Sequence, residues 1–137
     1  MFSQGQAGIN AYARVGVQTG VVGATPHRLV MMLYQGARQA IAQARMYSGQ
    51  NDVGSRGKLI TKAISIIEQG LQQSLNRDVG GDIAARLDAL YTYMAHRLFE
   101  ANLTQSEPML VEVDGLLATL EEAWLGIAPE VAKMAAA

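Results

Sequence analysis

The most constraining feature of this 137-residue sequence is a series of four segments in which apolar residues recur every three or four positions. This spacing places them on one face of an α-helix, whereas a half-buried strand would alternate every second residue. Each segment is about 20 residues long, or roughly 30 Å as a helix. The sequence therefore predicts an all-α fold, an antiparallel up-down four-helix bundle with a short N-terminal arm or helix. The predicted helices span about 26–47, 55–76, 82–102 and 106–125, within a bundle domain of residues 25–127.

The ends of these segments carry recognisable helix signals. Thr25 can cap the first helix, and Pro26 follows at a position where its missing N–H costs nothing. The glycines of 78–82 break the pattern before the third helix. Thr104 and Glu107 fit a capping box at the start of the fourth.

The second segment is apolar over a wider arc than a bundle seam needs. Beside its main stripe lies an adjoining one, so part of the arc is expected to face something other than this chain's own core. On the first helix, Met31 and Tyr34 lie off the main stripe, and methionine is favoured on surfaces that accept a flexible apolar partner. The main stripe is Ile60, Ile64, Ile67, Leu71 and Leu75, and the adjoining one is Leu59, Ala63, Ile66 and Gly70.

The two ends of the chain differ from the bundle. Residues 1–24 hold five glycines and are expected to form an arm. Within the arm, Ile9, Tyr12 and Val15 fall three apart, which would place them on one side of a short helix that needs a surface to dock on. Residues 128–137 are rich in alanine and are expected to form a flexible tail.

Composition and charge exclude several classes of function. Without cysteine there is no disulfide framework, thiolate zinc site or cysteine nucleophile. Residues 1–77 carry eight Lys/Arg and two Asp/Glu, whereas residues 78–137 carry three and ten. The basic side chains are scattered without interleaved aromatics, which argues against nucleic acid as a partner. Two positive helices packed beside two negative ones would instead favour the antiparallel arrangement.

No enzyme, metal or cofactor site is predicted. The only histidines are His27 and His96, and neither has a Glu three residues before it, so a di-iron site of the bundle type cannot form. There is no phosphate-binding Gly-Lys-Ser/Thr loop. The N-terminus lacks a secretory pattern and no apolar run is long enough to span a membrane, which predicts a cytoplasmic protein.

Several strings, spread in order over residues 9 to 124, resemble the FliS family of flagellin-specific export chaperones. The resemblance opens with Thr25-Pro26 and the string Leu29 to Ala37, and it ends with Glu122-Ala123-Trp124. Between them lie Lys62-Ala63, Ile66-Ile67, Leu75-Asn76, Gly80 to Ala84, Leu90-Tyr91-Thr92-Tyr93-Met94, Arg97-Leu98 and Glu100-Ala101-Asn102.

The resemblance implies a chaperone that binds the disordered C-terminal segment of flagellin, prevents premature polymerisation and delivers it to the flagellar export gate. It also implies that the arm can occupy a client site, with Ile9 and Tyr12 as the matching residues. A helical adaptor for another secreted filament protein is the alternative, and the chain is expected to be a monomer or weak homodimer. The candidate client-binding or cap residues are Ile9, Tyr12, Met31, Tyr34, Leu59, Ala63, Ile66 and Tyr93.

Overall fold

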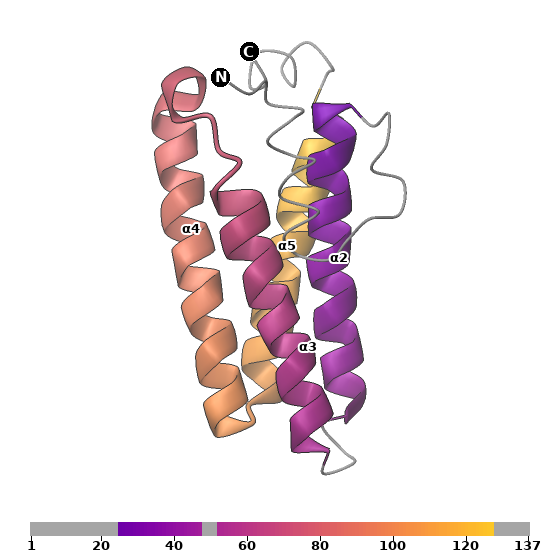
Figure 1. Cartoon of the computed structure of the whole chain (residues 1–137). Coiled ribbons are helices and arrows are strands. Elements are labelled where there is room, and N and C mark those ends of the chain that lie inside the picture. Colours follow the sequence, from indigo (N-terminus) through magenta and orange to yellow (C-terminus); the bar gives the residue numbers. More distant parts are fainter. Residues whose placement is uncertain (1–24, 48–51, 128–137) are drawn as a thin grey trace.

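The computed structural model describes residues 25–47 and 52–127, and in this part of the chain every long element is a helix (Figure 1). Helix α2 spans Pro26–Tyr47, α3 spans Val53–Ser65 and continues directly into the π-helix η1 at Ile66–Gln72, α4 spans Arg77–Thr104 and α5 spans Glu107–Gly126. Successive helices run in opposite directions along the bundle. The predicted all-α four-helix bundle is confirmed. The predicted arm and tail lie outside the described residues.

Capping explains where α2 and α3 begin. Helix α2 covers the predicted range 26–47, and the Arg28 N–H donates to Thr25 Oγ1 at 3.1 Å. Helix α3 starts two residues before the predicted position. Asp52 is its N-cap and accepts a hydrogen bond from the Ser55 N–H at 3.1 Å, which satisfies one of the orphan donors of the first turn.

The second helix ends at Gln72, earlier than the predicted limit of 76, because Asn76 serves the next helix. Its side chain accepts a hydrogen bond from the Val79 N–H at 3.1 Å and so caps α4. Helix α4 then starts at Arg77, before the predicted residue 82, but Gly81 interrupts it with φ 50° and ψ −125°. This left-handed backbone favours glycine, so the predicted break survives as a kink after the first turn.

Helices α4 and α5 meet at a tight turn. Gln105 has φ 53° and ends α4, and its N–H donates to the Ala101 carbonyl. Ser106, rather than the predicted Thr104, is the N-cap of α5 and accepts from the Met109 N–H at 3.4 Å. Thr104 instead donates its hydroxyl to the Glu100 carbonyl within α4.

The core is a continuous set of aliphatic side chains with two tyrosines inside it. Tyr34 and Tyr91 are each 2% exposed, and their hydroxyl oxygens are 2.6 Å apart in a hydrogen bond between α2 and α4. The buried core residues of the four helices include Leu29, Leu33, Ala37, Ile41, Ile60, Ile67, Met94, Leu98, Leu110, Val113 and Leu117.

The π-helix accounts for much of the wide apolar arc in the second segment. Within η1, Ile66, Ile67, Gly70 and Leu71 are all buried. The i to i+5 hydrogen bonds of a π-helix make each turn wider than an α turn, so one inner face takes residues from both predicted stripes. A Cβ atom at Gly70 would lie 2.7 Å from Leu33 Cδ2, which shows how closely α2 approaches η1. The adjoining stripe is therefore largely used by the bundle itself.

Candidate functional site

Polar bridges close the outer edge of the contact between α2 and α5. Arg38 on α2 donates to Asp114 and to Glu121 on α5, each at 2.9 Å, and Arg45 donates to Glu107 at 3.1 Å. The hydrogen bonds to Asp114 and Glu121 raise the pKa of Arg38 above its ordinary value. The basic α2 and the acidic α5 thus meet along their charged flanks.

A second polar cluster closes the contact between α4 and α5. Arg97 donates to Glu112 at 2.8 Å, and the Tyr93 hydroxyl donates to the same carboxylate. These bonds from Tyr93 and Arg97 lower the pKa of Glu112, and the bond to Glu112 raises the pKa of Tyr93. The Arg97 guanidinium also lies over the Tyr93 ring, 5.9 Å from its centroid.

A reciprocal pair joins the first turn of α2 to the last turn of α5. His27 Nε2 lies 2.7 Å from the Trp124 carbonyl oxygen, and Trp124 Nε1 donates to the His27 carbonyl at 3.0 Å. The two rings stack with centroids 5.2 Å apart and an angle of 11° between their planes. Trp124 is half-buried against the core.

Helix α4 is also bridged to the α3–η1 helix at both ends. Gln72 donates to Asp88 Oδ1 and to the Thr92 hydroxyl, each at 2.9 Å, and Arg77 donates to the same Asp88 oxygen at 2.8 Å. At the opposite end, Arg56 is 2% exposed and its guanidinium donates to the Ala101 carbonyl near the end of α4. A cation there is favoured by the helix dipole.

The contact between α2 and α3 differs from these, because no side-chain hydrogen bond or ion pair joins the two helices among residues 26–47 and 53–65. Leu59, Ala63 and Ile66 follow one another at helical spacing, in register with Gly70, whose contact with Leu33 fixes the side that faces α2. We call Leu59, Ala63 and Ile66, together with the flank of α2 that packs against them, the α2–α3 surface. Among the described residues, the side chains that join these two helices are therefore packed without a polar bridge.

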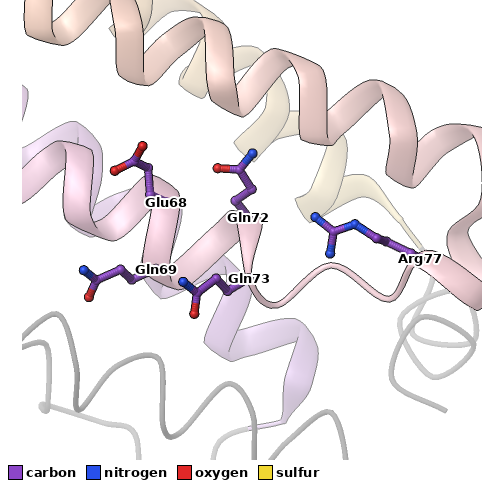
Figure 2. A pocket seen from close by; sticks show the side chains of 5 residues that line it. All are labelled: Glu68, Gln69, Gln72, Gln73 and Arg77. Atoms are coloured by element: carbon purple, nitrogen blue, oxygen red, sulfur yellow. The ribbon is translucent and has the colours of Figure 1, made fainter.

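A polar hollow of about 630 Å³ lies at the end of the π-helix (Figure 2). Gln72 and Glu68 extend toward α4, and Gln69 and Gln73 lie on the other side of η1. Arg77 closes the hollow from the start of α4. The triplet of glutamines at 69, 72 and 73 is the signal in the sequence that could have pointed to it.

The structure distributes the predicted site residues over several faces. Leu59 is half-buried, while Ala63 and Ile66 are fully buried, and these three lie together on the α2–α3 surface. Tyr34 lies in the core, and Tyr93 is 43% exposed beside Glu112. Met31 is 4% exposed but outside the contiguous core. It stands four residues after His27 and seven before Arg38, which puts it on the flank toward α5. Ile9 and Tyr12 lie outside the described residues.

Sequence reasoning missed two features of the structure. The His27–Trp124 pair joins residues 97 apart, and the hollow at η1 depends on the π turn.

Within the part of the chain that the structure describes, no group of three or more His, Asp or Glu side chains could hold a metal ion. None of the helices described is both long and apolar enough to cross a membrane.

Comparison with known proteins gives the family of this helical bundle. A family model described as flagellar protein FliS matches residues 8–131. The chain is 44% identical over 124 residues to the flagellar secretion chaperone FliS of Salmonella typhimurium, covering 90% of this chain and 92% of that protein. It is 37% identical over 117 residues to the Escherichia coli chaperone of the same name, with 85% and 86% covered, and 35% identical over 107 residues to that of Bacillus subtilis, with 78% of each covered. This chain therefore belongs to the FliS family of flagellar secretion chaperones.

Proposed function

We propose that this protein is a cytoplasmic chaperone that binds the disordered C-terminal segment of flagellin, prevents its premature polymerisation and delivers it to the flagellar export gate. Membership of the FliS family supports a role in flagellar secretion. The observation that carries the binding proposal is the α2–α3 surface, because no side-chain hydrogen bond or ion pair joins residues 26–47 to residues 53–65. A partner can cover this surface without breaking any ion pair.

The binding mode follows from the shape and chemistry of a helical bundle. A disordered segment folds into amphipathic helices as it lays its apolar face along the chaperone. Leu59 contacts the client directly, while Ala63 and Ile66 set the close approach of α2 and α3 beneath it. Tyr34 supports the surface from within the core, and Met31 and Tyr93 border neighbouring faces. The cost of ordering the client keeps binding reversible enough for release at the gate.

The N-terminal arm has a proposed role as a competitor of the client. In the free protein, Ile9 and Tyr12 dock on the client site, so the client's apparent affinity is reduced by the fraction of chaperone with the arm released. The double change Ile9→Ala and Tyr12→Ala should leave the bundle folded, raise dye-detectable apolar exposure and tighten client binding. If the double variant is folded but no longer binds the client, the arm is part of the client-binding site and not a competitor of the client.

Titration with a purified C-terminal flagellin segment tests the proposed function. The complex should show more helix by circular dichroism than the sum of its parts, and calorimetry should give a negative heat-capacity change. Flagellin polymerisation, followed by light scattering, should be delayed in proportion to the chaperone added. A segment from the middle of flagellin serves as the control. Tight binding with additive spectra would contradict the coupled folding, and no binding would contradict the proposed function.

A further inference from the structure

The α2–α3 surface carries positive charge that the bundle leaves uncompensated. Helix α2 contains no Asp or Glu, and residues 52–72 contain only Asp52 and Glu68, one near each end. Arg38 and Arg45 are engaged with α5, and Arg56 is buried against α4. The remaining cations of α3 are Lys58 and Lys62, which are both exposed.

The two lysines stand one helical turn apart beside the apolar residues of this surface. Lys62 is three residues after Leu59 and four before Ile66, so it borders their column on the solvent side. Neither lysine forms an ion pair with any residue in the described ranges. Asp52 feels the field of Lys58: the pKa of Asp52 is lowered mainly by its hydrogen bonds from Ser55 and, to a smaller extent, by Lys58. Lys62 has no ion-pair partner among the described residues.

Charge thus distinguishes the α2–α3 surface from the α2–α5 and α4–α5 contacts. The α2–α5 and α4–α5 contacts each match an arginine to carboxylates of this chain. On the α2–α3 surface, Lys58 and Lys62 form no ion pair with any carboxylate of the described residues. Exposed charges at the rim of an interface steer association and suppress wrong partners more than they add affinity.

We propose that Lys58 and Lys62 determine the specificity of the α2–α3 surface, selecting an amphipathic helix of the client whose apolar stripe is flanked by Asp or Glu. This inference rests on the proposed function and adds the charge pattern that a client segment must carry. The apolar stripe of that helix covers Leu59, and its acidic flank lies along the lysines. A helix with a basic flank is repelled, because like charges across an interface are unfavourable.

The expected effect is on the rate of association and its dependence on salt. Steering by exposed charges acts before contact and is screened within about 10 Å at 0.1 M salt. The double change Lys58→Gln and Lys62→Gln should slow association with the flagellin C-terminal segment about 3- to 10-fold at low ionic strength. The difference should vanish at high ionic strength, and dissociation should change less.

Stopped-flow association at low and high ionic strength tests the proposal, with four chaperones compared: the unchanged chain, Lys58→Gln with Lys62→Gln, Lys62→Glu, and Arg86→Gln. Arg86 is the matched control, since it is exposed on α4 and pairs with no residue that the structure describes. Melting curves and circular dichroism confirm that each variant is folded. The probes are the flagellin segment and the same segment with its acidic residues changed to amides.

The proposal expects the lysine variants, but not Arg86→Gln, to slow association with the acidic segment. It also expects the amide segment to bind all four chaperones at the same reduced rate. If the unchanged chain binds and the lysine variants associate as fast as Arg86→Gln, the proposal is overturned while the proposed function stands. If the unchanged chain does not bind the segment, the proposed function is wrong, and this inference, which rests on it, is wrong as well.

Discussion

Replacing either tyrosine of the buried Tyr34–Tyr91 pair by phenylalanine should destabilise the bundle, whereas replacing both should leave its stability nearly unchanged. The two hydroxyl oxygens are 2.6 Å apart, and each side chain is 2% exposed. Removing one hydroxyl leaves the other buried without this partner, which costs about 1–3 kcal/mol. Removing both takes away the polar groups together. No carbon atom is lost, so no cavity larger than a hydroxyl remains.

The same pair makes a prediction at alkaline pH. Burial is the main cause that raises the pKa of Tyr34 and of Tyr91, while tyrosine in an unfolded chain titrates near pH 10. Above that pH the unfolded chain loses protons that the folded chain keeps. Stability therefore falls as pH rises, by up to about 1.4 kcal/mol per pH unit for each tyrosine. In the variant with both tyrosines changed to phenylalanine, this contribution to the fall of stability with pH should be absent.

Urea unfolding at neutral pH and between about pH 10 and 11 measures both effects. Tyr93→Phe is the matched control, because it removes a tyrosine hydroxyl that is bonded to Glu112 on an exposed side chain. Its effect at neutral pH should stay below about 1 kcal/mol. Single variants as stable as the unchanged chain, or a double variant that costs the sum of the two, would refute the account of the core.

Two further changes probe contacts that position the helices. Trp124→Ala should lower the free energy of unfolding by about 3 kcal/mol, which is the lower end of the range for a large aromatic side chain because this ring is only half-buried. An unchanged melting temperature would show that the stack of Trp124 on His27 contributes nothing to stability. Gly70→Ala should lower the free energy of unfolding, measured by chemical denaturation, by about 1–3 kcal/mol. The added methyl group would lie 2.7 Å from Leu33 Cδ2, and Leu33 is fully buried, so its side chain cannot move toward solvent. In a Leu33→Ala background the same change should be neutral or stabilising, and an equal cost in both backgrounds would contradict the close contact.

Local signals in the sequence were enough to predict the helices but not every boundary. The cap at Thr25 and the following proline act within one turn, and the predicted range of α2 coincides with the observed one. Asn76 was assigned to the end of the second helix, although its side chain caps the next. Either role satisfies the apolar spacing, and only the direction of one side chain distinguishes them.

The candidate site could be predicted only in part, because the decisive contacts join distant residues. The Leu59, Ala63 and Ile66 stripe was visible as excess apolar surface, but the π turn that draws Ile66 and Gly70 into the core leaves the periodicity almost unchanged. Tyr34 lies off the main stripe, and its burial depends on Tyr91, 57 residues away. The opposite charges of the two halves were apparent, but which surface stays uncompensated depends on how Arg38 and Arg45 pair with α5.

Hydrogen exchange of the chaperone with and without the flagellin C-terminal segment is the most direct test of the client site. Amide groups on α2 and α3 should gain the most protection in the complex, because the proposed client helix covers the surface between them. The α4–α5 contact, closed by Arg97 and Glu112, should change less. Binding of the segment with new protection confined to α4 and α5, and none on α2 or α3, would contradict the account.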